Sequence, residues 1–175
     1  MESYLTSVIK QFERYKSLGD KTLEQLTFDD LQNEIAKDSN SIAIMVKHLY
    51  GNMLSRWTNF LDEDGEKPSR NRDREFDDTY ETREQILAHW NAGWTCLFDA
   101  LNNLTSEDLE RIIYIRNERH TVVEAINRQL AHYAYHVGQM VFLGKVFKGN
   151  DWQTLSIARG ASKKYNAEKF SEEKN

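Results

Sequence analysis

The sequence predicts a single all-α domain, residues 1–175, folded as a four-helix bundle with a short irregular or extended segment before the last helix. Apolar residues recur at steps of three and four along four long stretches, which is the spacing of amphipathic helices. One proline and eight glycines leave few helix breakers in the chain. A composition of 39% hydrophobic and 29% charged residues is typical of a folded globular protein. Together these observations favour long helices joined by polar loops.

The first half of the chain predicts two long helices. Between residues 4 and about 26 the following apolar side chains share helical spacing: Tyr4, Leu5, Val8, Ile9, Phe12 and Tyr15. A short turn of helix is expected around residues 29–35, and polar residues at 38–41 offer N-caps for a second long helix. We expect that helix to reach about residue 61. Residues 62–78 then form a strongly charged loop, which contains the only proline and is too polar to enter the core.

The second half predicts two more long helices. Helical spacing of apolar residues indicates one helix over residues 82–102. Residues 112–115 form a short β-branched and aromatic run, which favours an extended segment. Thr121 followed by Glu124 matches a capping box, so the last long helix is expected to begin there and to reach about residue 146. Three apolar residues are expected to anchor the polar tail, residues 149–175, on the domain: Trp152, Leu155 and Ile157.

Composition also excludes several classes of function. The formal charge of −5 and the lack of a sustained basic stripe argue against nucleic-acid binding. The longest apolar runs are too short to cross a bilayer and the N-terminus lacks the apolar core of a signal peptide, so we expect a cytoplasmic protein that does not bind membranes. Cys96 is the only cysteine, which excludes an intramolecular disulfide and a cysteine-based zinc site. Its apolar helical surroundings favour an inert thiol.

Histidines supply the clearest sign of chemistry. His132 and His136 are one helical turn apart, so both imidazoles face the same side and can reach one divalent ion. An exposed histidine pair is the alternative interpretation of this spacing. His48 on the second long helix lies among apolar residues that point inward, and facing helices of a bundle commonly build metal sites from such side chains. Three imidazoles would leave a coordination position open, as in catalytic sites. His89 and His120 are weaker candidates, better explained by an edge or capping position.

The residues around these histidines resemble a known family. The run H-Y-A-Y-H-V-G-Q at residues 132–139, together with His48, resembles the DinB/YfiT-like superfamily over the whole four-helix body. Three further stretches, residues 52–67, 70–76 and 155–162, are similar to its uncharacterised DUF1572 branch. A di-iron carboxylate bundle is the alternative metal site. It needs Glu-x-x-His motifs, and no Glu lies three residues before any of the three histidines.

This resemblance implies an up-down-down-up helix order, a homodimer, and a facial three-histidine site for one divalent ion on His48, His132 and His136. The expected ion is zinc or nickel, with manganese or iron as alternatives. Characterised relatives are metal-dependent transferases or isomerases that use small thiols such as bacillithiol, mycothiol or glutathione, whereas the DUF1572 branch has no established reaction. We therefore expect a metal-dependent thiol transferase that acts on a small-molecule thiol.

Two other functions remain open at this point. A metal-dependent hydrolase would use the same three ligands, but no Asp or Glu lies in the ligand turns to act as a general base. A non-catalytic, dimeric metal-binding interaction module is the second alternative. Five further polar residues are candidates for supporting the ligands or contacting substrate: Gln139, Asn52, Arg70, Arg72 and Arg74. Two interpretations of the three arginines stay open. They bind an anionic thiol, or they belong to a solvated surface whose positive and negative charges neutralise each other.

Overall fold

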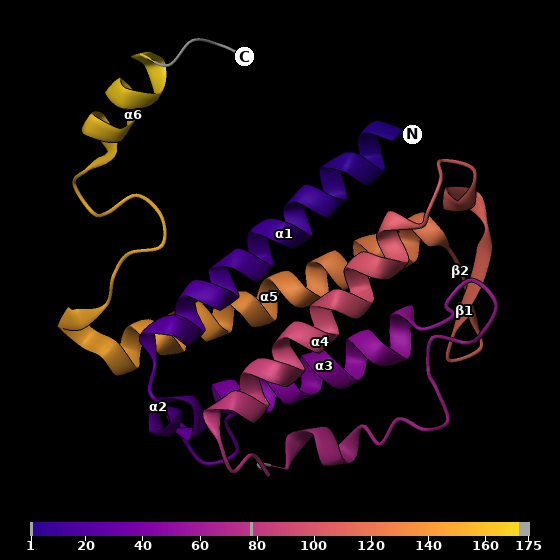
Figure 1. The fold of residues 1–175 in the computed structure, drawn as a ribbon, viewed down its shortest axis with the longest axis horizontal. Coiled ribbons are helices and arrows are strands. Elements are labelled where there is room, and N and C mark those ends of the chain that lie inside the picture. Colours follow the sequence, from indigo (N-terminus) through magenta and orange to yellow (C-terminus); the bar gives the residue numbers. More distant parts are fainter. Residues whose placement is uncertain (1, 78, 172–175) are drawn as a thin grey trace.

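A computed structural model describes residues 2–77 and 79–171 of the chain (Figure 1). Four long helices form the body of the protein: α1 (Glu2–Gln25), α3 (Ile42–Trp57), α4 (Arg83–Asn102) and α5 (Val122–Lys148). Two shorter helices and a hairpin complete the regular structure: α2 (Phe28–Gln32), α6 (Ser162–Ser171), β1 (Ile112–Ile115) and β2 (Glu118–Thr121). Short 3-10 turns lie at Asp73–Phe76, Asp108–Glu110 and Gly149–Asp151. The mostly helical fold is thus confirmed, whereas the up-down-down-up order stays a prediction.

Side-chain caps fix where the helices begin. Thr121 accepts a hydrogen bond from the backbone N–H of Glu124, whose carboxylate accepts one from the backbone N–H of Thr121, so the predicted capping box is confirmed. Ser41 accepts from the backbone N–H of Ile44 at the start of α3. These caps fix the first residues of α3 and α5, the two helices that carry the three histidines.

The core is built around aromatic rings from three helices. Trp94 and Tyr133 are fully buried with Phe12, and their ring centroids lie 5.9 Å apart. Trp57 Nε1 donates a hydrogen bond to the Tyr133 hydroxyl, which donates in turn to Asn52 Oδ1, each at 3.0 Å. This polar chain joins α5 to α3 through the core and satisfies the buried hydroxyl. The helical tryptophans Trp57, Trp90 and Trp94 are all buried in this core.

The loop between α3 and α4 differs from its prediction in two ways. First, α3 ends at Trp57 rather than near residue 61, because Thr58 is extended, with ψ of 121°, and Asn59 follows in a left-handed conformation with φ of 46°. Second, the expectation that this segment is too polar for the core is wrong for Glu75, which is buried, and for Arg70, whose side chain is only 4% exposed. Pairing between the two charges makes their burial possible. Asp78, at the end of the predicted loop, lies outside the described residues.

The second half of the chain also contains elements that the sequence did not predict. The extended run at Ile112–Ile115 is confirmed as β1, but it pairs antiparallel with a second strand through a turn at Arg116 and Asn117, both with positive φ. The tail contains α6, and none of the described residues of α6 is buried. Ile157 is 41% exposed and is therefore a poor anchor, whereas Trp152 is half-buried against Gly144. Residues 172–175 of the tail lie outside the described residues.

No helix among the described residues combines the length and apolar character needed to cross a membrane.

Candidate metal centre

The structure brings His48, His132 and His136 together between α3 and α5. One ring nitrogen from each histidine lies within 4.8 Å of the other two. The Nε2 atoms of His48 and His132 are 3.3 Å apart, and the His48 and His136 rings have centroids 5.1 Å apart. His48 and His136 are buried, and His132 is half-buried. This cluster could hold a metal ion, and it consists of the three histidines that the sequence singled out.

Glu75 fixes the orientation of His48. The His48 ring lies with Nδ1 2.9 Å from Glu75 Oε2. Arg70 donates two hydrogen bonds to the same carboxylate, from Nε to Oε1 at 2.7 Å and from Nη2 to Oε2 at 2.9 Å. Burial raises the pKa of Glu75, but the hydrogen bonds from His48 and Arg70 outweigh it and lower the pKa below its ordinary value. Glu75 is therefore an ionised acceptor, so His48 Nδ1 donates and Nε2 faces the cluster.

The other two rings are oriented by glutamines on α5. His136 Nδ1 lies 3.1 Å from Gln139 Oε1, and His132 Nδ1 lies 3.4 Å from Gln129 Oε1. An amide oxygen only accepts, so Nδ1 carries the hydrogen and Nε2 is left as the lone pair in each ring. Oxygen partners on the outer nitrogen are the usual support of histidines that bind metal. Gln139, which the sequence singled out as a possible support for the histidines, thus contacts His136.

Electrostatics keep His132 and His136 neutral at neutral pH. Burial lowers the pKa of His132 to about 3, assisted by His136, His48, Arg56 and Arg70, and burial lowers the pKa of His136 to about 4. A neutral imidazole is the form that binds metals.

Two nitrogen atoms test whether a metal fits this cluster. The buried Nε2 of His136 has no hydrogen-bond partner among the described residues. The neutral His132 presents its Nε2 lone pair to His48 Nε2, an arrangement that needs a proton or a metal cation between the two nitrogens. Both features fit a cation shared by the three rings.

A cavity of about 230 Å³ opens on His48 and His132. Asn52, Arg70 and Arg72 line it, so with Gln139, which contacts His136, four of the five supporting candidates lie beside the histidines. Asn52 itself accepts from Tyr133 and contacts no ligand ring through a hydrogen bond. Arg74 does not line this cavity but lines a separate one of about 550 Å³, which is formed by α3, the loop after it and His89 of α4. Arg72 and Arg74 thus line different cavities, whereas Arg70 lines both.

The remaining candidates lie away from the cluster. His89 stacks on Tyr50 with centroids 4.1 Å apart, and its Nδ1 lies 2.8 Å from the Tyr80 hydroxyl. His120 is half-buried in β2, and it does not belong to the cluster. Burial raises the pKa of the Cys96 thiol, which agrees with the prediction of an inert cysteine.

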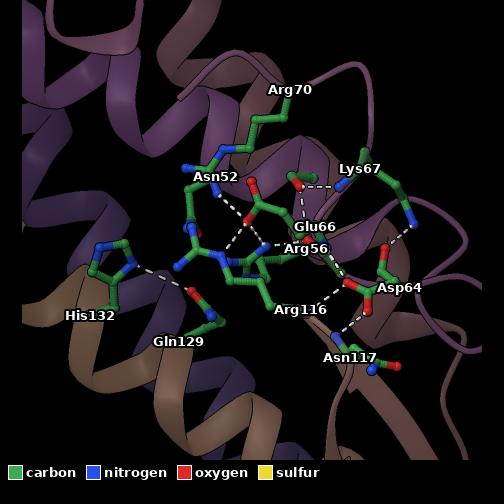
Figure 2. A network of polar contacts seen from close by, with 12 residues as sticks. Asn52, Arg56, Asp64, Glu66, Lys67, Arg70, Arg116, Asn117, Gln129 and His132 are labelled. Carbon is green, nitrogen blue, oxygen red and sulfur yellow. Dashed lines mark hydrogen bonds and ion pairs between the residues drawn. The ribbon is translucent and has the colours of Figure 1, made fainter. Parts of the chain in front are cut away.

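Sequence reasoning missed several residues of the site. Glu75 lies in an aperiodic charged segment, so no sequence pattern linked it to His48. Gln129 had a detectable signal: it precedes His132 by three residues, just as Gln139 follows His136 by three. Three further arginines line the cavity without having been singled out: Arg56, Arg116 and Arg128. Figure 2 shows how Arg56, Arg70 and Arg116 gather on this side of His132.

Comparison with known proteins identifies a family for this chain but no activity. A family model described as "Protein of unknown function (DUF1572)" matches residues 1–161. No curated protein matches the sequence.

Proposed function

This chain belongs to the DUF1572 family, and from that premise we propose that it is a metal-dependent enzyme that holds one divalent ion through His48, His132 and His136. The observation that carries the proposal is the common orientation of the three rings. Each Nδ1 has an oxygen partner, which leaves the three Nε2 atoms for the space they share. A site of three imidazoles suits zinc, nickel or iron and leaves at least one position open.

We propose that the substrate at the open position is a low-molecular-weight thiol. An ion bound there would lower the pKa of a coordinated thiol, so that a nucleophilic thiolate exists at neutral pH. Glu75 would hold His48 in the tautomer that binds metal, and the walls of the adjoining cavity would orient the thiol. The resemblance to thiol-using relatives supports this choice of substrate.

The hydrolase alternative has less support. Among the described residues that line the cavity there is no Asp or Glu, so no carboxylate is placed there to activate a water molecule. Glu75 approaches the cluster, but both of its oxygens are engaged by Arg70 and His48. A carboxylate held in this way orients a ligand rather than moving a proton.

Cobalt-substituted protein can test the metal and the thiol separately. Metal-free protein is loaded with Co²⁺ and titrated with glutathione or bacillithiol, because a thiolate bound to cobalt gives a near-ultraviolet charge-transfer band. We expect the band to saturate with thiol, to be absent with S-methylglutathione, and to be lost in His132→Ala. His89→Ala, which removes a histidine outside the cluster, serves as the matched control and should keep the band.

Two results would overturn parts of the proposal. Cobalt bound at one equivalent without a thiolate band would rule out thiol chemistry while leaving the metal site intact. Equal cobalt binding by wild type and His132→Ala would reject the three-histidine site itself. The first result would leave the hydrolase and the metal-binding interaction module as the accounts of the site, whereas the second would reject every function that uses this site.

A further inference from the structure

Arginines dominate the cavity beside the histidines. Five of its ten lining residues are Arg56, Arg70, Arg72, Arg116 and Arg128, and none of the described lining residues is acidic. They come from four separate parts of the chain: α3, the loop after it, the turn of the β-hairpin, and α5. Convergence of like charges from four elements opposes folding unless something neutralises them. The gathering of five arginines around one cavity therefore needs an explanation other than the solubility that surface charges provide.

Carboxylates behind the cavity wall neutralise only part of this charge. Glu66 pairs with Arg56 at 3.0 Å, and with Arg70 and Arg116 at 3.2 Å each. Glu75 pairs with Arg70. Three of the five guanidinium groups thus share two carboxylates, so the five arginines exceed these carboxylates by three positive charges. Counting the nearby Asp64 as a third carboxylate still leaves an excess of two.

Two of the excess charges lie on exposed arginines, Arg72 and Arg128. Arg72 and Arg128 form no ion pair with any described residue, although the Arg72 guanidinium lies 5.0 Å from the centre of the Phe76 ring. By contrast, Arg56 and Arg70 are buried and held rigidly by Glu66, as Figure 2 shows. Even so, Arg56 keeps one buried nitrogen, Nε, without a hydrogen-bond partner among the described residues. The cavity thus combines a fixed positive wall with two free guanidinium groups at its rim.

We propose that this cavity binds an anionic group, a carboxylate or a phosphate, on the substrate that reaches the histidine cluster. The inference rests on the proposed function for the position of the reacting atom, but the arginines can bind the anion without a metal. Guanidinium groups recognise carboxylates and phosphates through paired N–H donors. A volume of about 230 Å³ is smaller than a pocket for a whole drug-sized ligand, so it suits a small anion or the charged end of a larger molecule.

Calorimetric titration of metal-free protein tests this assignment with two probes, inorganic phosphate and succinate. We expect saturable binding of at least one probe, and the stronger probe indicates which anion the wall prefers. Arg72→Gln and Arg128→Gln are the informative variants, because both residues are exposed and removing them leaves no buried charge unpaired. Each should raise the Kd about threefold to tenfold.

Arg14→Gln is the matched control. It removes the same charge from an exposed helical position on α1 and should leave the Kd unchanged. The inference is overturned if neither probe binds metal-free protein at millimolar concentrations, or if Arg14→Gln weakens binding as much as Arg128→Gln. It is also overturned if probes bind only after zinc loading and equally well in all variants, because the metal would then be the anion's sole partner. Failure of metal binding alone would reject the proposed function without affecting these titrations.

Discussion

His48 Nδ1 lies 2.9 Å from Glu75 Oε2, a hydrogen bond that joins a candidate metal ligand to a carboxylate 27 residues further along the chain. Arg70 holds the carboxylate from its other side. The ligand is therefore positioned by a buried network rather than by its own helix alone. This relationship explains why a strongly charged loop folds against α3.

Glu75→Gln should weaken metal binding. The substitution keeps the shape of the side chain but removes the charge that fixes the His48 tautomer, and loss of such support typically costs about 10-fold to 100-fold in affinity. Competition with a chromophoric zinc chelator measures the change. Asp73→Asn removes a charge from an exposed position in the same 3-10 turn and should leave the affinity unchanged. Identical affinities for Glu75→Gln and wild type would contradict the supporting role of this carboxylate.

Gly51→Ala should damage the same network through sterics. A Cβ atom at this position of α3 would collide with the carboxylate of Glu75, which cannot move freely because Arg70 and His48 hold it. We expect a loss of about 1–3 kcal/mol in the free energy of unfolding, together with weaker zinc binding. Gly138→Ala on α5 is the control, because nothing lies within 4 Å of the added Cβ. That variant should be as stable as wild type or up to about 1 kcal/mol more stable.

Phe12→Ala should destabilise the fold strongly. Phe12 is fully buried, and its ring packs against Trp94 and Tyr133. Removing such a ring costs about 3–5 kcal/mol, through lost burial and the cavity left behind. Phe170→Ala makes the same change at a residue that is 85% exposed and should alter stability by less than about 0.5 kcal/mol. Urea denaturation of the two variants gives the comparison, and similar midpoints would show that the aromatic core is wrongly described.

Asp64 should contribute stability that depends on pH. Burial raises its pKa, but hydrogen bonds from the backbone N–H groups of Asn117, Glu66 and Arg116 outweigh burial and lower the pKa. A carboxylate with a lowered pKa in the folded state stabilises the protein above its unfolded pKa of about 3.9. That contribution is lost as the pH falls through the lower pKa of the folded state.

Asp64→Asn should therefore cost about 1 kcal/mol at neutral pH and progressively less as the pH falls below 4. Urea titrations over a series of pH values measure this difference. Asp62→Asn, at a residue whose side chain is 82% exposed, should show little effect at any pH. A cost for Asp64→Asn that stays constant down to the most acidic condition would mean that the charge plays no part.

The long helices could be predicted because their signals are local. Apolar spacing and the Thr121 capping box act within a few residues, so the start of α5 follows directly from the sequence. The end of α3 did not follow, because the left-handed conformation of Asn59 leaves no apolar pattern behind. The second strand was missed for a similar reason: Glu118–Thr121 is polar and contains no buried residue, so it carries no strand signal.

The candidate site also contains some residues with a local sequence signal and others without one. His132 and His136 share a helix face through sequence spacing alone, and His48 could be added because its neighbours point inward. The supporting shell depends on the path of the loop, which brings Glu75 and Arg70 back against α3. A run of alternating charges looks the same in sequence whether it is solvated or folded over a site. Only the structure separates Arg72, which lines the cavity, from Arg74, which does not.

Metal content is the most direct test of the central claim. Untagged protein, purified without chelator, is analysed for elements as wild type, His48→Ala and the control His89→Ala. We predict close to one equivalent of a divalent metal in wild type and His89→Ala and none in His48→Ala, with unchanged helical circular dichroism in all three. The absence of metal from wild type after reconstitution with zinc and nickel, or its retention in His48→Ala, would contradict the account.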